Sequence, residues 1–179
     1  MHQERIGKVL DLCREHGVRQ ALLTDMNSVF YLTGRMIYTG SRLLALLLRD
    51  DGQHRLFLNQ LYAAPEGLGM ELVRFSDTDD VPAIIAAHTD HSAPLGIDRK
   101  MTAGHLLALQ GLGAASGYVN VSPWVDEVRS QKDAQEQELM KAASRINDQA
   151  MAEFKKLIRP GVSELDVARQ IEGIYRTLG

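Results

Sequence analysis

The distribution of apolar residues changes near residue 122, and this change limits what the chain can fold into. Before that point, short apolar runs alternate with segments in which apolar residues recur every three or four positions. Short runs are typical of buried strands, and the longer period is typical of amphipathic helices. After Pro123 only the helical pattern is present. We therefore expect two domains, residues 1–122 and residues 123–179, of which only the first contains a sheet.

The first domain is predicted to have an α/β fold, in which helices pack against a mixed sheet. Strands are expected at residues 21–24, 43–48, 55–58, 72–75, 94–98 and 118–121. Helices are expected from Ile6 to a stop at Gly17, at residues 81–88 and at residues 102–112. Asp51-Gly52, between two of the strands, is typical of a hairpin turn. Residues 25–28 are interpreted as a turn, because Asp and Asn side chains bond to nearby backbone.

The second domain is predicted to begin with two helices. Residues 133–159 carry a helical pattern whose apolar residues fall on one face. These residues are Leu139, Ala143, Ile146, Ala150, Phe154 and Leu157. Pro160-Gly161 ends this helix, and Ser163 is expected to cap a second one. Because such apolar stripes normally need other structure to cover them, the segment is interpreted as the opening of a larger domain. We also expect a homodimer in which the stripes contact a second copy.

Charge and composition argue against several classes of partner. The net charge is −3, and acidic and basic residues are interspersed without a run of four Lys or Arg. A nucleic-acid partner is therefore not expected. The longest apolar stretch, residues 43–48, is far shorter than the roughly 20 residues that span a bilayer. The N-terminus lacks the apolar core of a signal peptide. We expect a cytoplasmic protein with no membrane partner.

Few residues form a pattern that indicates chemistry. His88 and His91 form the only dense His/Asp group, but they precede a polar loop, and a solvated helix terminus is the favoured interpretation. Cys13, the only cysteine, lies on an apolar stripe and is interpreted as a core thiol. The glycine-rich residues 111–117 follow a helix and lack the lysine of a phosphate loop. A small enzyme with an unrecognised site, around the two histidines or Arg42, stays open as an alternative.

Motifs along nearly the whole chain form an ordered set. Residues 21–27 lead into Tyr31-Leu32-Thr33-Gly34, and Leu95-Gly96-Ile97-Asp98 follows later. Residues 128–136 and 158–164 continue the series. Together these motifs resemble the creatinase and prolidase (Xaa-Pro dipeptidase) branch of the pita-bread metallopeptidase family. The last two are similar to the segment that joins its two domains and to the turn between the first two helices of its catalytic domain.

The resemblance implies a three-layer N-terminal domain with a mixed sheet of about six strands, followed by the start of the catalytic domain. In such enzymes the N-terminal domain is non-catalytic, forms dimer contacts and lends wall residues to the partner's active site. Tyr31, Gly34, Tyr38 and Arg42 are the candidates here for a substrate pocket or a dimer rim. Arg42 also precedes its strand as in the family, and a guanidinium suits a peptide carboxylate.

The resemblance also implies where the metal site lies. The family's two divalent ions, Mn, Co or Zn, are held by two Asp, one His and two Glu of the catalytic domain. All five would fall after Gly179, so neither catalytic nor metal-ligating residues are expected in this chain. The whole enzyme of which this chain would be a part is expected to cleave a bond next to proline in small peptides. A fragment of a creatinase-like amidinohydrolase is the alternative within the family.

Overall fold

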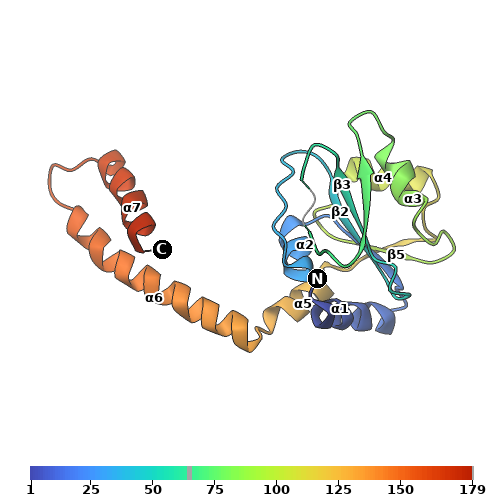
Figure 1. Ribbon diagram of the computed structural model, residues 1–179, viewed down its shortest axis with the longest axis horizontal. Helices are drawn as coiled ribbons and strands as arrows, with labels where there is room; N and C mark the ends of the chain where they lie inside the picture. Colours follow the sequence, from blue (N-terminus) through green and yellow to red (C-terminus); the bar gives the residue numbers. More distant parts are fainter. Residues whose placement is uncertain (64–65, 179) are drawn as a thin grey trace. The chain divides into compact units, whose positions relative to one another are not determined.

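The computed structural model describes residues 1–63 and 66–178, which form two compact units that meet between Ser130 and Gln131. The first unit contains a sheet and its helices, and the second contains only two helices (Figure 1). The apolar pattern of the sequence changes after residue 122, before a short helix that belongs to the first unit. The division into domains at residue 122 stays a prediction.

The first unit is an α/β structure, as predicted. Its strands are β1 (Gln20–Leu23), β2 (Leu44–Arg49), β3 (Arg55–Asn59), β4 (Glu71–Phe75), β5 (Leu95–Ile97) and β6 (Tyr118–Asn120). Its helices are α1 (Gln3–Glu15), α2 (Met26–Thr33), α3 (Val81–Ala86), α4 (Ala103–Gly111) and α5 (Ser122–Ser130). The predicted mixed sheet of six strands is confirmed. Its order is β4-β3-β2-β1-β5-β6.

The sheet is antiparallel at its centre and parallel toward both edges. β2 pairs antiparallel with both β1 and β3, and the β2–β3 hairpin turns at Asp51-Gly52 as predicted. β1 pairs parallel with β5, so that Ala21 lies opposite Gly96. Adjacent parallel strands need a crossover connection, and the intervening segment supplies the helices that cover the sheet. Because β1 and β5 run in parallel, their carboxyl ends lie together at the same edge of the sheet.

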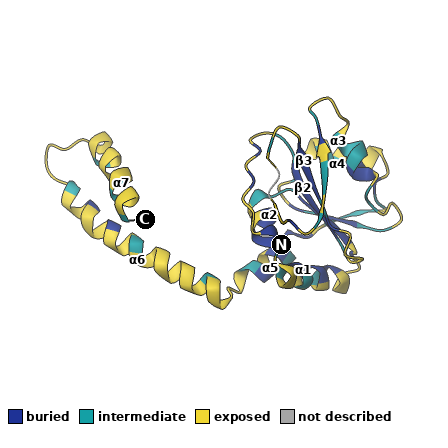
Figure 2. Cartoon of the chain, in the orientation of Figure 1, coloured by how far each residue is buried: buried dark blue, intermediate teal, exposed yellow. Residues whose placement is uncertain are grey.

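Helices cover both faces of this sheet, which makes three layers. On one face, α1, α2 and α5 pack over Ala21 and Leu23 of β1. On the other face, α3 and α4 pack over Leu22. Because successive strand side chains point to opposite faces, neighbouring residues of β1 belong to different cores. The residues of both cores are buried (Figure 2).

Two local expectations were wrong. Residues 25–28 are not a turn: Asp25 caps α2, and its carboxylate accepts a hydrogen bond from the backbone N–H of Ser28 at 3.1 Å. The side-chain chemistry that makes an Asx turn also caps a helix, so the pattern alone does not separate them. Residues 122–130 form α5 although no helix was predicted there. Val125 and Val128 of α5 are buried in the same core as α1.

The second unit is a pair of helices, α6 (Ala134–Leu157) and α7 (Glu164–Leu178), as predicted. Asp133 and Glu136 form a reciprocal capping box at the start of α6. Phe154 contacts the Tyr175 ring edge-on at 5.2 Å, and the Tyr175 hydroxyl donates to Asn147 Oδ1 at 2.9 Å. Of the predicted stripe only Ala150 and Phe154 are buried.

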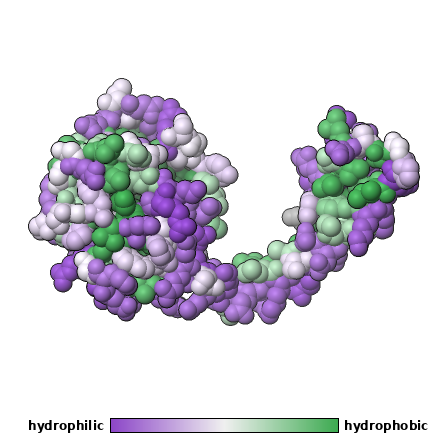
Figure 3. All heavy atoms as spheres, turned by 180° about the vertical axis from the view of Figure 1, so that it is seen from behind, coloured by the Kyte–Doolittle hydropathy of each residue, from purple (hydrophilic) through white to green (hydrophobic). Residues whose placement is uncertain are grey.

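Much of the apolar surface of these two helices is uncovered. Leu139, Met140, Met151, Leu165 and Tyr175 are each at least 40% exposed, and apolar side chains gather on the pair in Figure 3. Within the described residues, no helix combines the length and the apolar character needed to cross a bilayer.

The β2–β3 hairpin contains a histidine that should make stability depend on pH. His54 is buried, its Nδ1 accepts a hydrogen bond from the backbone N–H of Arg49 at 3.2 Å, and burial lowers its pKa. The unfolded chain therefore takes up a proton near pH 6.5 while the folded chain does not. Stability is fully present above that pH and is lost as pH falls toward the lower folded pKa.

We expect the free energy of unfolding to fall by up to about 1.4 kcal/mol per pH unit from this group below pH 6.5. Urea unfolding between pH 7.5 and 5.5 measures it, since carboxyl groups titrate lower, near pH 4. His54→Asn, which keeps an acceptor but cannot titrate, should flatten the slope. Burial also lowers the pKa of His88, so part of the slope should remain. An unchanged slope in His54→Asn contradicts the assignment.

Candidate functional site

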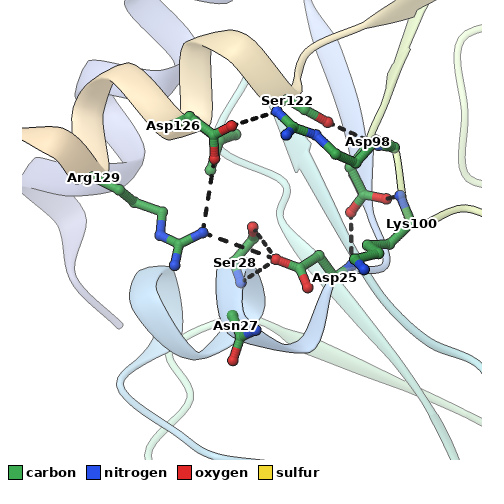
Figure 4. Close-up of a pocket in the computed structure, with 10 residues that line it drawn as sticks. Asp25, Asn27, Ser28, Asp98, Lys100, Ser122, Asp126 and Arg129 are labelled. Carbon is green, nitrogen blue, oxygen red and sulfur yellow. Dashed lines mark hydrogen bonds and ion pairs between the residues drawn. The ribbon is translucent and has the colours of Figure 1, made fainter.

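Two pockets open where β1 and β5 end. One, which we call the Asp98 pocket, has a volume of about 190 Å³ and is drawn in Figure 4. The other, which we call the Lys100 pocket, has a volume of about 270 Å³ and is lined by Thr24, Tyr38, Arg42, Lys100 and His105, among others. Lys100 lines both.

Asp98 fixes the geometry of this edge. Its carboxylate is buried and follows β5 directly. It accepts hydrogen bonds from the backbone N–H groups of Thr24, Asp25, Lys100 and Met101, and from the Thr24 hydroxyl at 2.8 Å. One side chain thus ties the segment after β1 to the segment after β5. These donors already occupy both carboxylate oxygens, so Asp98 is a structural residue here and a poor metal ligand.

The charged groups of the Asp98 pocket neutralise one another. Arg129 lies between Asp25 and Asp126, with its Nη1 at 4.0 Å and 3.9 Å from their oxygens (Figure 4). Arg99 pairs with Asp126 as well. Three acidic and three basic side chains line this pocket. Since the charges balance within the pocket, it offers no net attraction for an ion.

The loop that precedes β2 forms one wall of the Lys100 pocket. Ile37 and Thr39 are buried, and the Thr39 carbonyl accepts a hydrogen bond from the Tyr62 hydroxyl at 2.6 Å. The Arg42 guanidinium donates to both oxygens of Asp77, at 2.8 Å and 2.6 Å, and this cation lowers the pKa of the Asp77 carboxyl. The loop is therefore held at both ends, and Tyr38 between them is 74% exposed.

The structure brings together two of the four residues that the sequence indicated. Tyr38 and Arg42 both line the Lys100 pocket. Tyr31 instead packs in the core, where its hydroxyl donates to the Val128 carbonyl at 3.3 Å. The Arg5 guanidinium lies 4.4 Å from the centre of its ring. Tyr31 lines neither of the two pockets, and its place at a dimer rim stays a prediction.

Gly34 has a local structural role at the end of α2. It ends α2 with a left-handed backbone, φ 69°, and donates its N–H to the Phe30 carbonyl. Residues other than glycine rarely adopt that backbone conformation. A Cβ at this position would also come within 2.8 Å of the His2 imidazole. Gly34 therefore holds the start of the exposed loop, and a role at a dimer rim stays a prediction.

The other candidates have structural surroundings. His91 Nε2 lies 2.9 Å from the Ala86 carbonyl, and the His88 ring packs against Phe57. Cys13 is buried, and burial raises its pKa to about 12, so almost no thiolate is present at neutral pH. Across residues 1–63 and 66–178, no three His, Cys, Asp or Glu side chains are grouped so that they could hold a metal ion.

Sequence reasoning missed Lys100 and His105. His105 Nδ1 lies 2.7 Å from the Thr102 hydroxyl at the start of α4, and Lys100 follows the buried Asp98. Neither residue lies in a motif of the sequence. The opposite wall of their pocket comes from residues 24–44, which are distant in the sequence. Only the pairing of β1 with β5 places the two segments side by side. The acid that ends a predicted strand, Asp98, was the one available signal.

Two family models match successive segments of the chain. The family described as creatinase/prolidase N-terminal domain matches residues 5–131, and metallopeptidase family M24 matches residues 138–179. The uncharacterized peptidase YqhT of Bacillus subtilis is 25% identical over 181 residues, which is 98% of this chain and 49% of that protein.

Solved structures show the same architecture. The prolidase from Thermococcus sibiricus is 26% identical with a TM-score of 0.86, and the match covers 98% of this chain and 50% of that one. An Xaa-Pro dipeptidase from Bacillus anthracis matches at 23% identity and a TM-score of 0.79, over 99% of this chain and 49% of its own. The chain thus spans about half the length of the relatives it matches.

Proposed function

The chain belongs to the creatinase/prolidase N-terminal domain family, and on this basis we propose that it is the non-catalytic part of an Xaa-Pro dipeptidase-like metallopeptidase. The observation that carries the proposal is the order of two family matches along one chain, at residues 5–131 and 138–179, over half the length of peptidase relatives. The first unit is then the N-terminal domain. Helices α6 and α7 are the start of the catalytic domain.

In this proposal the two divalent ions are held outside the described residues. The chemistry of the present side chains supports it. The buried carboxylate of Asp98 is saturated by backbone donors, and the exposed carboxylates of Asp77 and Asp126 are paired with arginines. Two-metal hydrolysis needs several free carboxylates that converge on ions roughly 4 Å apart. The described residues offer no such group.

The proposed role of the first unit is to cap a substrate pocket and to form a dimer. The loop between α2 and β2 supports it, because Tyr38 and Met36 on this loop are 74% and 50% exposed to solvent. The buried side chains of Ile37 and Thr39 anchor the loop. Aromatic side chains held on a rigid frame are common at binding surfaces. The uncovered apolar faces of α6 and α7 support a protein contact in the second unit.

The test is a hydrolysis assay of the purified 179-residue chain. With Xaa-Pro dipeptides or creatine as substrate and Mn²⁺, Co²⁺ or Zn²⁺ added, we expect no turnover above the metal-only blank. Light scattering of the same sample should give the mass of a dimer. Turnover at the rate of an intact prolidase would contradict a non-catalytic role, and a clean monomer at high concentration would contradict the proposed dimer.

A further inference from the structure

The edge where β1 and β5 end is a topological switch point. β1 and β5 are parallel neighbours. The chain leaves β1 toward α2, which packs on one face of the sheet, and leaves β5 toward α4, which packs on the other. Connections that diverge to opposite faces leave a crevice between them, and open α/β sheets bind ligands in such crevices. The Lys100 pocket lies there, between Thr24 after β1 and Lys100 after β5.

The charges of this pocket are one-sided. None of the described residues that line it is Asp or Glu. The charge of Arg42 is already matched by Asp77, whose two carboxylate oxygens accept hydrogen bonds from Nε and Nη2 of Arg42. Lys100 is exposed and forms no ion pair within the described part of the chain. A pocket with one unmatched ammonium and no carboxylate attracts anions.

The pocket also supplies hydrogen-bond donors. The phenol of Tyr38 is one, while the hydroxyls of Thr24 and Thr102, which also line the pocket, are already bonded to Asp98 and to His105 Nδ1. His105 binds Thr102 through Nδ1, which leaves its Nε2 without a partner among residues 1–63 and 66–178. Oxyanions are recognised by a cation together with several neutral donors. With about 270 Å³, the pocket is at the small end of ligand sites, which run from about 300 Å³.

From these observations we propose that the Lys100 pocket binds a small oxyanion, the carboxylate or phosphate group of a small molecule. Lys100 supplies the charge, and His105 supplies a donor from α4. The Asp98 pocket beside it does not share this role, because its two arginines are already paired with the carboxylates of Asp25 and Asp126. The site lies wholly within the first unit and does not depend on the proposed peptidase relation.

The experiment is a titration of the uniformly ¹⁵N-labelled 179-residue chain, followed by amide chemical shifts. Acetate represents a carboxylate, inorganic phosphate represents a phosphate, and sodium chloride at matched ionic strength is the blank. We expect saturable shifts at Lys100, Thr102 and His105 with one or both anions and none with chloride. The stronger anion identifies the class of ligand. Shifts that are equal with chloride, or that fail to saturate, would overturn the proposal.

Variants decide whether the charge at this position matters. Lys100→Gln should raise the dissociation constant of the anion at least fivefold, and His105→Gln should raise it at least twofold. Lys155→Gln, which removes the same charge from an exposed position on α6, is the matched control and should bind like the parent chain. Equal affinities in the Lys100 and Lys155 variants would overturn the proposal. Peptidase activity is not measured in this experiment, so the anion-site proposal can fail or succeed independently of the proposed function.

Discussion

Asp98→Ala should lower the free energy of unfolding of the first unit by about 4 kcal/mol, since a donor left without its partner in the interior costs about 1–3 kcal/mol. The carboxylate of Asp98 accepts hydrogen bonds from four backbone N–H groups and one hydroxyl, with most distances between 2.7 and 3.0 Å. Alanine removes the acceptor and leaves these donors behind. Some will reach water at the edge of the sheet, which limits the loss.

Urea unfolding followed by the fluorescence of Trp124, the only tryptophan, measures this loss, because Trp124 lies on α5 against the core of the first unit. Asp126→Ala is the matched control. It also removes a carboxylate of the Asp98 pocket, but one whose partners are arginines at the surface, and exposed pairs are worth about 1 kcal/mol or less. If the two variants lose the same stability, Asp98 does not hold the edge together.

The strands of the first unit were predictable because burial is written into their residues. β2 is apolar over almost its whole length, and β1 and β3 are short apolar runs with polar ends. The Asp51-Gly52 turn then fixes the hairpin. Such signals are local, so they survive without knowledge of the fold. They also place α1 and the two helices of the second unit.

The missed helices show what local pattern lacks. α2 is eight residues long and starts with chemistry that suits a turn equally well. α5 starts at Ser122-Pro123 and presents only two buried valines, Val125 and Val128. Proline in a first helical turn is well tolerated, but it also marks loops. Tertiary contacts with α1 decide both cases, and a single sequence does not contain them.

The candidate site was only half predictable for a different reason. Tyr38 and Arg42 were candidates because they lie near a motif that resembles a known family, and both line the Lys100 pocket. Lys100 and His105 reach the same pocket from a segment about 60 residues away. The order of strands in the sheet brings them together, since β5 pairs with β1 although β2, β3 and β4 come between the two in the sequence. Tyr31, found through the same motif, packs into the core instead.

The same pairing of β1 and β5 depends on a residue without a side chain, Gly96. A Cβ at Gly96 would collide with Cγ1 of Val121 and would lie 3.2 Å from the Ala21 Cβ and 3.3 Å from the Gln20 carbonyl oxygen. Two of these atoms belong to β1, and Val121 immediately precedes α5. A side chain at this position must therefore push α5 away from the sheet or separate the two parallel strands.

Gly96→Val should consequently cost about 3 kcal/mol of unfolding free energy, the upper end for overpacking a well-filled core. It should also weaken anion binding at the Lys100 pocket, because that pocket needs β1 and β5 in register. Gly104→Val is the matched control: nothing lies within 4 Å of a Cβ at Gly104 in α4, so stability should change by less than about 0.5 kcal/mol. Urea unfolding and the acetate or phosphate titration, run on both variants, separate the outcomes. A stable Gly96→Val chain with intact binding would mean that the two strands can separate without harm, and that the switch point does not set the geometry of the pocket.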